Sequence, residues 1–493
     1  MILRIIDNDF HFECENLCRI FYPNEKITVM RNYDGEDDKT VCVKCTETGE
    51  KVEITVECKI GEKLKSLSDS VNGNLDSARN ECELTCARLI YLILTEITGY
   101  EPPWGLLTGV RPSKLFLNLT DEMGKEKAEA YFLNKLLVSP EKTKLAVTVA
   151  ENEKRIISLS KPDSFSLYIS IPFCPSRCSY CSFVSHSIGN PNAKKILPEY
   201  LERLKDEIRY TGSLADEIGL KLETVYIGGG TPGVLEAEQT DELISEIENS
   251  FDLSNIREFT VEMGRPDTVT AEKLEVLQKH NVGRISINPQ TFNQQTLDVI
   301  GRKHTVQQTF DAFELSKNYS FNCINMDLIA GLPGENLDDY IKSVDCAIRL
   351  SPENITVHSL ALKRSSNLNT QGSQVQDGIE AKKMVDYSTR KLLEAGYIPY
   401  YMYRQSKCVG NLENVGWCKE GTNGYYNVYM MEETHTVLAC GAGAVAKLCV
   451  PKSTKVERIF NYKYPFEYNS GFDEIIKRKE VIKEFYNKYN IIR

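Results

Sequence analysis

The chain has 493 residues, of which 26% are charged, and its formal net charge at pH 7 is −11. This length is too great for one ordinary hydrophobic core, so we expect two or three domains. The acidic balance and the scattered basic residues argue against nucleic acid as the main partner. No apolar run is long enough to span a bilayer, and the sixteen cysteines occur without a secretory signal. This pattern favours reduced thiols and a cytoplasmic protein.

The N-terminal segment, residues 1–160, has the pattern of a small α+β domain. Alternating apolar residues at 41–45 and 52–56 predict a β-hairpin, and residues 78–98 predict a long helix that ends at a glycine. Paired cysteines in both elements could bind metal, but a free cysteine is more often a small buried hydrophobe. Prolines and glycines in residues 102–112 indicate either a rigid linker or part of a cover for a later active site.

Residues 161–362 alternate hydrophobic strands with amphipathic helices. This alternation is typical of repeated β/α units around a parallel sheet. Six units favour a partial TIM-like barrel, in which polar residues at the carboxyl ends of the strands converge on one face. The predicted strands are residues 166–171, 224–227, 258–262, 284–288, 322–329 and 354–360.

The C-terminal segment, residues 363–493, begins with a predicted helix through Lys391. It continues into stretches rich in Gly, Tyr and Asn around residues 421–429 and 438–444. Such stretches either approach a flat ligand closely or form a tyrosine-rich hairpin packed on the barrel. The predicted fold is therefore α/β: a partial (β/α)6 barrel with an N-terminal α+β domain and a C-terminal α+β extension that covers the substrate.

Three closely spaced cysteines follow the first predicted strand of the barrel. Cys174, Cys178 and Cys181 form the pattern C-x3-C-x2-C. Three thiolates can bind three irons of a cubane iron–sulfur cluster and leave the fourth iron open, whereas a four-cysteine site would be closed. The spacing therefore indicates a cluster with one position free for another ligand.

Glycines and polar residues end several of the other strands. Gly228, Gly229 and Gly230, followed by Thr231, expose backbone groups to which a small zwitterion can hydrogen-bond. A buried structural carboxylate is the alternative for Asp327, and a surface arginine is the alternative for Arg302, whose forked donors could bind a carboxylate. The polar candidates expected at the same face are Glu262, Asn288, Gln290, Arg302 and Asp327.

The cysteine loop, preceded by Tyr168, resembles that of the radical S-adenosylmethionine (SAM) superfamily. Gly-Gly-Gly-Thr-Pro from Gly228, Ser-Ile-Asn-Pro-Gln from Ser286 and Asp-Leu-Ile-Ala-Gly-Leu-Pro-Gly from Asp327 narrow the likeness. Together these motifs resemble the oxygen-independent coproporphyrinogen III oxidase (coproporphyrinogen dehydrogenase) family. Motifs that begin at Trp104, Glu262, Tyr400 and Gly410 are similar to its HemZ-type branch.

The resemblance implies a role for each matching residue. Cys174, Cys178 and Cys181 are expected to bind a [4Fe–4S] cluster, with SAM at the open iron and Tyr168 beside the cluster as a catalytic residue. The expected SAM contacts are Gly228, Gly229, Gly230, Thr231, Glu262, Gln290, Arg302 and Asp327.

The resemblance also implies a reaction. An external electron donor such as flavodoxin or ferredoxin reduces the cluster, and SAM is cleaved to a 5′-deoxyadenosyl radical. The radical removes hydrogen from a propionate of coproporphyrinogen III, and loss of carbon dioxide and one electron leaves a vinyl group, which gives protoporphyrinogen IX. A related tetrapyrrole is an alternative substrate. Arg265, Lys303 and Arg404 are candidates to bind the propionates.

One position departs from the dehydrogenase pattern. Coproporphyrinogen dehydrogenases have a further cysteine two positions after the third ligand, where this chain has Phe183. A phenylalanine there is similar to the haem-chaperone branch of the same family. The His-Asn-x-x-Tyr-Trp run typical of that branch does not occur in this sequence. Because Phe183 departs from the dehydrogenase pattern, a haem-binding chaperone stays an alternative to the dehydrogenase. A related radical SAM methyltransferase is a further alternative.

Overall fold

The computed structural model describes residues 1–23, 25–31, 37–183, 185–361, 378–405 and 408–491. The chain forms two compact units: residues 1–147 with 404–412, and residues 148–403 with 413–493. The chain therefore leaves the larger unit once, to add a short segment to the smaller one. None of the described helices combines the length and the apolar character that a membrane crossing requires.

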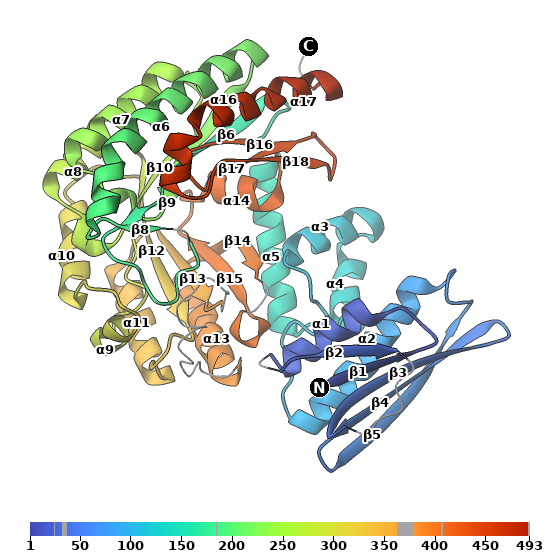
Figure 1. The fold of residues 1–493 in the computed structure, drawn as a ribbon. Coiled ribbons are helices and arrows are strands. Elements are labelled where there is room, and N and C mark those ends of the chain that lie inside the picture. The colour runs from blue at the N-terminus through green and yellow to red at the C-terminus, as the bar shows by residue number, and fades with distance from the viewer. Residues whose placement is uncertain (24, 32–36, 184, 362–377, 406–407, 492–493) are drawn as a thin grey trace. The chain divides into compact units, whose positions relative to one another are not determined.

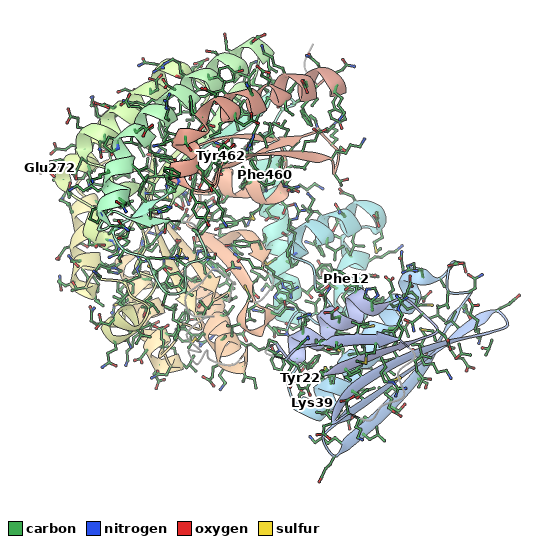
Figure 2. All side chains as sticks on the ribbon, viewed as in Figure 1. Phe12, Tyr22, Lys39, Glu272, Phe460 and Tyr462 are labelled. Carbon is green, nitrogen blue, oxygen red and sulfur yellow. The ribbon has the colours of Figure 1, made fainter. Side chains whose placement is uncertain are left out.

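The smaller unit contains a five-stranded sheet. Its strands are β1 (Ile2–Ile6), β2 (Thr28–Arg31), β3 (Lys39–Thr48), β4 (Lys51–Ile60) and β5 (Lys63–Asn72). They lie in the order β2-β1-β3-β4-β5, with β1 parallel to both neighbours and the last three antiparallel. At the start of β3, Lys39 lies over the ring of Tyr22, 5.4 Å from its centroid (Figure 2).

Helices complete the smaller unit. They are α1 (His11–Phe21), α2 (Arg79–Thr98), α3 (Pro112–Met123), α4 (Lys125–Asn134) and the first part of α5 (Pro140–Ile157). Alternate residues of β3 and β4 pack against α1 and α2 in one apolar core, and Gly99 ends α2 in the left-handed conformation. The predicted hairpin and long helix are thus present. Cys45, Cys82 and Cys86 are fully buried in this core, as expected of structural thiols.

The larger unit is built on one eleven-stranded sheet (Figure 1). Its strands are β6 (Ser164–Ile171), β9 (Lys221–Gly229), β10 (Glu258–Gly264), β11 (Arg284–Ile287), β12 (Cys323–Ala330), β13 (Asn354–Ser359), β14 (Ile398–Arg404), β15 (Glu413–Cys418), β16 (Thr436–Cys440), β17 (Val445–Cys449) and β18 (Val456–Phe460). The order is β14-β15-β13-β12-β11-β10-β9-β6-β16-β17-β18. A separate two-stranded ladder joins β7 (Phe173–Cys174) to β8 (His186–Ser187).

Helices connect the successive parallel strands and lie along the outer side of the sheet (Figure 1). They are α6 (Pro191–Ile218), α7 (Ala237–Ser250), α8 (Ala271–Lys279), α9 (Gln294–Val299), α10 (Val306–Ser316), α11 (Leu337–Leu350) and α13 (Gly378–Glu394). Apolar residues from these helices and strands form one core. All six predicted strands are present and pair in parallel, so the expected partial (β/α)6 barrel is confirmed.

The C-terminal region adds strands to the same sheet. β16 runs parallel to β6, and β17 and β18 follow it antiparallel, while β15 pairs antiparallel with β13. The sequence segments 161–362 and 363–493 therefore share one sheet. Residues 362–377, where the C-terminal segment was predicted to begin, lie outside the described residues. The remaining helices are α14 (Tyr425–Glu432), α15 (Pro465–Ser470), α16 (Phe472–Lys479) and α17 (Val481–Tyr489).

Stacked tyrosines fill the inner side of this sheet. The rings of Tyr226 and Tyr426 are 4.4 Å apart between centroids, and each lies 6.3 Å from the ring of Tyr168. The turn from Gly441 to Ala444 approaches the chain itself, because the Ala442 carbonyl accepts a hydrogen bond from Ser170 at 2.8 Å. These stretches therefore pack against the barrel, but the predicted tyrosine-rich hairpin is wrong. Tyr425–Glu432 forms the helix α14, and Thr436–Cys440 is a strand of the barrel's own sheet.

Candidate active site

The cysteine loop leaves the carboxyl end of β6 and is fastened by backbone hydrogen bonds. The Ser179 amide donates to the Ile300 carbonyl at 2.9 Å, and the Ile188 amide donates to the Cys174 carbonyl at 2.9 Å. Cys178 is 9% exposed. Burial raises the pKa of Cys174, and it raises that of Cys181 to about 11. These two thiols are therefore protonated at neutral pH and must release protons when they bind a metal.

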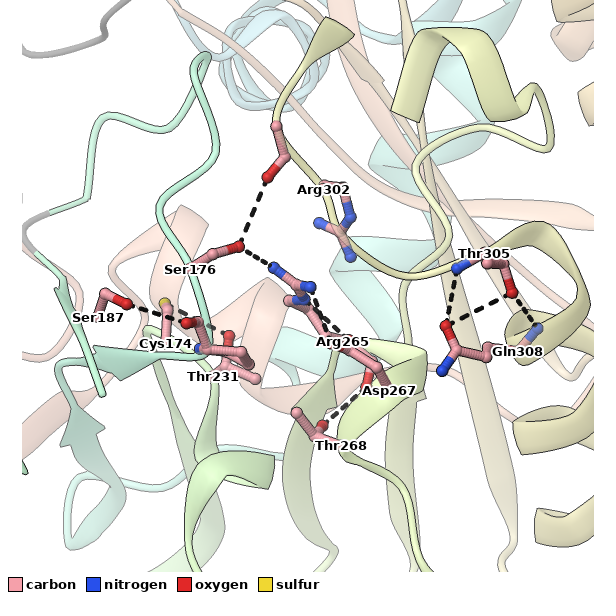
Figure 3. A network of polar contacts seen from close by, with 12 residues as sticks. Cys174, Ser176, Ser187, Thr231, Arg265, Asp267, Thr268, Arg302, Thr305 and Gln308 are labelled. Atoms are coloured by element: carbon pink, nitrogen blue, oxygen red, sulfur yellow. Dashed lines mark hydrogen bonds and ion pairs between the residues drawn. The ribbon is translucent and has the colours of Figure 1, made fainter. Parts of the chain in front are cut away.

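Two buried arginines attach this loop to the neighbouring strand ends. Arg302 donates to the Tyr180 hydroxyl at 3.1 Å and to the Asn288 carbonyl at 2.6 Å. Arg265 donates to the Ser176 hydroxyl at 2.5 Å and pairs with Asp267 at 2.8 Å (Figure 3). The loop is thus fastened by one arginine that follows β10 and by another that lies between α9 and α10.

The glycine triplet lies directly against the cysteine loop. The Gly230 amide donates to the Ile171 carbonyl and the Thr231 amide to the Phe173 carbonyl, both at 2.8 Å. Thr231 also donates from its hydroxyl to the Cys174 sulfur at 3.4 Å (Figure 3). An ammonium group donates hydrogen bonds, so the carbonyl oxygens of this triplet, and not its amides, are the candidates to bind one.

Glu262 lies beside the first glycines of the triplet. A Cβ atom at Gly228 would lie 2.8 Å from the Glu262 carboxylate, which accepts hydrogen bonds from the Tyr226 hydroxyl and the Gly229 amide. Burial, with a contribution from the nearby Asp327, raises the pKa of Glu262 to about 7 despite these hydrogen bonds. Glu262 therefore changes charge near neutral pH.

Asp327 lies at the same edge, on β12. Its Oδ1 accepts a hydrogen bond from Asn325 at 2.8 Å, and its Oδ2 is 3.8 Å from Nε2 of His358 on β13. Burial acts to raise the pKa of Asp327, but His358 and Asn325 outweigh it, so the pKa is lowered overall. Asp327 is thus ionised at neutral pH.

Polar atoms without partners cluster at the end of β11. Gln290 has a left-handed backbone with φ of +68°, and its amide donates to the Asp327 carbonyl at 2.9 Å. Within the described residues, the buried Gln290 Oε1, Asn288 Oδ1 and Arg302 Nε have no hydrogen-bond partner. Buried polar atoms are normally paired, so this edge is suited to a polar ligand.

The donor set fits a cluster better than a single ion. In the part of the chain that the structure describes, no three His, Cys, Asp or Glu side chains converge as one metal ion would require. A cubane cluster binds each thiolate to a different iron, so the loop of Cys174, Cys178 and Cys181 agrees with that arrangement. The glycine carbonyls and the unpartnered amide and guanidinium atoms provide matching groups for a zwitterionic ligand beside it.

Some residues at this edge were not predicted from the sequence. They include Tyr226, which donates to Glu262, and His358, which pairs with Asp327. Tyr226 is two residues before the glycine triplet, so the sequence could have placed it near the site. His358 stands at the carboxyl end of the sixth strand and could have been found by the same rule as Asp327.

Two of the proposed propionate ligands have other roles. Arg265 is 3% exposed and is held by Asp267 and Ser176. Arg404 belongs to the smaller unit, where it donates to the Leu107 carbonyl at 2.7 Å. We therefore assign structural roles to these two arginines, because their donors are used inside the chain. Lys303 is exposed and stays a candidate.

Comparison with known proteins first gives the class. The model of the radical SAM superfamily matches residues 168–347. The solved structure of the Escherichia coli coproporphyrinogen III oxidase HemN, a radical SAM enzyme, aligns with a TM-score of 0.51 at 19% identity, covering 66% of this chain and 72% of that one. At this identity the likeness concerns the fold alone. The chain thus contains a radical SAM domain, and proteins of this class use a [4Fe–4S] cluster and SAM as cofactors.

A full-length relative then gives the family. The oxygen-independent coproporphyrinogen-III oxidase-like protein HemZ of Bacillus subtilis is 37% identical over 495 residues, which cover 97% of this chain and 97% of that protein. The chain therefore belongs to the HemZ-like family of oxygen-independent coproporphyrinogen III oxidase-like proteins. The haem chaperone HemW of the same organism is 37% identical over 199 residues, 40% of this chain and 51% of HemW.

Proposed function

We propose that this chain is a radical SAM enzyme that converts propionate side chains of coproporphyrinogen III, or of a related tetrapyrrole, into vinyl groups. The product from coproporphyrinogen III is protoporphyrinogen IX. The observation that carries this proposal is the 37% identity to HemZ over 97% of both chains. The coproporphyrinogen III oxidase of Bradyrhizobium diazoefficiens adds support, with 26% identity over 291 residues.

Cys174, Cys178 and Cys181 hold the cluster in this proposal. SAM lies against Gly228–Gly230 and Thr231 and contacts Glu262, Gln290, Arg302 and Asp327. When bound, the two cofactors supply removal of a hydrogen atom and transfer of single electrons. Tyr168 lies beside the cluster and SAM, where its ring, stacked near Tyr226 and Tyr426, excludes water.

The reaction defines what the polypeptide must do. Each propionate loses one hydrogen atom to the radical, one electron to an acceptor, and carbon dioxide, which leaves a vinyl group. The chain binds and orients the propionate and keeps water away, and the cofactors break the bonds. In this proposal the electrons would come from an external donor such as flavodoxin or ferredoxin. The enzyme would work in the cytoplasm.

A haem-trafficking protein is the second candidate function. Phe183 replaces the fourth cysteine of the dehydrogenases and is 64% exposed beside the cysteine loop. A phenylalanine at this position resembles the pattern of the haem chaperones. The haem chaperone HemW of Bacillus subtilis matches this chain over 51% of its own length. Haem bound in a one-to-one ratio without decarboxylation would favour this function.

An anaerobic assay read by mass tests the proposal. The reconstituted full-length chain, with SAM, a chemical reductant and coproporphyrinogen III, should yield products that have lost carbon dioxide and two hydrogen atoms per propionate. Cys178→Ala should lose the iron and the activity together, because one of three ligands is missing. SAM cleavage without this mass loss contradicts the substrate assignment, and a gain of mass indicates a methyltransferase instead.

A further inference from the structure

One histidine lies among the carboxylates at the active edge of the larger unit. His358 and Asp327 have 27% and 18% of their side chains exposed and form an ion pair at 3.8 Å. The negative charge of Glu262 on β10 also raises the pKa of His358. The group therefore contains two acids and one base, and it is partly open to a ligand.

Asn414, from a motif of the C-terminal region, holds this histidine from the other side. Val415 pairs with Val357 across the antiparallel strands β15 and β13, which brings Asn414 to the end of β13. Its Oδ1 accepts a hydrogen bond from the Ser359 amide at 3.0 Å and another from the His358 ring. His358 thus lies between a carboxylate and an amide oxygen, and both favour its charged form.

The charge of this group depends on pH in the neutral range. Burial acts to lower the pKa of His358, but Asp327, Asn414 and Glu262 outweigh it and raise the pKa above its usual 6.5. The pKa of Glu262 is raised to about 7. At lower pH the group holds neutral Glu262, anionic Asp327 and cationic His358, with no net charge. At higher pH it holds two carboxylates and a neutral imidazole.

Tyrosines that face the same acids do not change this balance. Burial raises the pKa of Tyr226 on β9 and of Tyr401 on β14 well above 10. The negative charge of Asp327 raises both values further. Both tyrosines stay neutral through the physiological range. Among the groups that influence these two acids most strongly in the described residues, His358 is the one that can carry a positive charge.

SAM brings its own positive charge to this edge. The cofactor carries a sulfonium, an ammonium and a carboxylate, so its net charge at neutral pH is +1. We propose that His358 is the internal counter-cation of Glu262 and Asp327, and that binding of SAM displaces the proton of His358 to solvent. The inference rests on the proposed function only in placing SAM at these two carboxylates. Like charges in one partly buried site repel strongly, which provides the driving force for this exchange.

Calorimetry of SAM binding tests the exchange without any turnover. Anaerobically reconstituted enzyme is titrated with SAM at pH 6, 7 and 8 in buffers of different ionisation enthalpy, which gives the number of protons released. The wild-type enzyme should release protons and bind SAM more tightly as pH rises, by up to about tenfold per pH unit for each proton exchanged. His358→Gln keeps a polar side chain without the charge. It should release fewer protons and bind SAM on the order of tenfold more tightly at pH 6.

Further variants keep the outcome interpretable. Asn414→Ala should lower the pKa of His358 and move the change in affinity to lower pH. His280→Gln is the matched control, because His280 lies beyond α8 and pairs with Asp241 and Glu248, each at 2.9 Å. Unchanged proton release in His358→Gln, or weaker SAM binding at every pH, overturns the inference. Porphyrinogen conversion is measured separately, so failure of the substrate assignment leaves the binding result readable.

Discussion

Gly230 shows how closely the backbone is packed where β9 ends beside the cysteine loop. A Cβ atom there would lie 2.5 Å from the Phe173 carbonyl and 2.8 Å from the Ile171 carbonyl. Both contacts are backbone, so relief requires β9 to move away from the cysteine loop. A glycine is therefore needed at position 230 because the backbone of Ile171 and Phe173 lies so close. This reason holds whether or not a ligand also binds there.

Gly230→Ala should separate the glycine triplet from the cysteine loop. We expect SAM affinity and iron content to fall at least tenfold, with a loss of about 1–3 kcal/mol in the free energy of unfolding from overpacking. Gly189→Ala is a matched control in the same loop region, because its nearest neighbour would be an ordinary contact at 3.4 Å. Iron, sulfide and SAM binding per chain measure the effect. Normal values for Gly230→Ala would show that the loop adapts.

Some residues of the candidate site could be predicted from the sequence, and others could not, because they meet through long-range strand pairing. Glu262, Gln290 and Asp327 could be predicted, because parallel strands place their carboxyl ends at one edge. The contact of His358 with Asn414 could not be predicted, since it depends on the antiparallel register of β15, which no local pattern encodes. The single-residue departure at Phe183 was visible in the sequence, but its chemical meaning depends on the substrate.

At the scale of elements, a buried ion pair attaches α16 to α6. Glu207 and Lys479 are 0% and 2% exposed, and their charged atoms are 3.0 Å apart. Glu207 also accepts hydrogen bonds from the Gly441 amide at 2.7 Å and the Tyr468 hydroxyl at 2.6 Å. The turn after β16 is therefore held by helices from both ends of the larger unit's sequence.

Lys479→Met should destabilise the larger unit strongly, because it leaves the buried carboxylate of Glu207 without its cation. We expect a loss of about 3–5 kcal/mol in the free energy of unfolding, measured by denaturant titration of the cluster-free protein. The double variant Glu207→Gln with Lys479→Met should recover part of this loss. Equal stability of the single and double variants would show that the carboxylate of Glu207 carries no penalty when its cation is absent.

The strands of the barrel were predicted to within a few residues because each is a short, fully buried run between amphipathic helices. β16 was not predicted as a sheet strand. Its five residues are followed by a glycine-rich turn that suggested a loop. Its partner β6 lies about 270 residues earlier in the chain, and pairing over such a distance leaves no trace in local periodicity.

At the scale of the whole molecule, Arg404 explains why two distant motifs occur together. In the smaller unit its guanidinium donates to the carbonyls of Leu107 and Asn411 and lies 5.5 Å from the Trp104 ring centroid. The motifs that begin at Trp104 and Gly410 are thus parts of one structure. A role of residues 102–112 in covering the active site stays a prediction.

Arg404→Lys should loosen the smaller unit, because a lysine cannot reproduce the planar fork that reaches several carbonyls. We expect a loss of about 2 kcal/mol and faster amide exchange in residues 104–111, measured by hydrogen–deuterium exchange. Arg349→Lys on the exposed side of α11 is the control and should change neither property. If exchange in residues 104–111 keeps its wild-type rate in Arg404→Lys, the carbonyl contacts do not stabilise this segment.

The position of β6 inside the sheet has a consequence for biosynthesis. β6 carries the cysteine loop, and its outer neighbour is β16, residues Thr436–Cys440. A ribosome delivers β6 first, and the strand that completes its hydrogen bonding emerges about 270 residues later. Pairing over so long a separation is also slow. We therefore expect the three thiols to wait in an incompletely paired sheet, so that iron–sulfur loading follows the synthesis of β16.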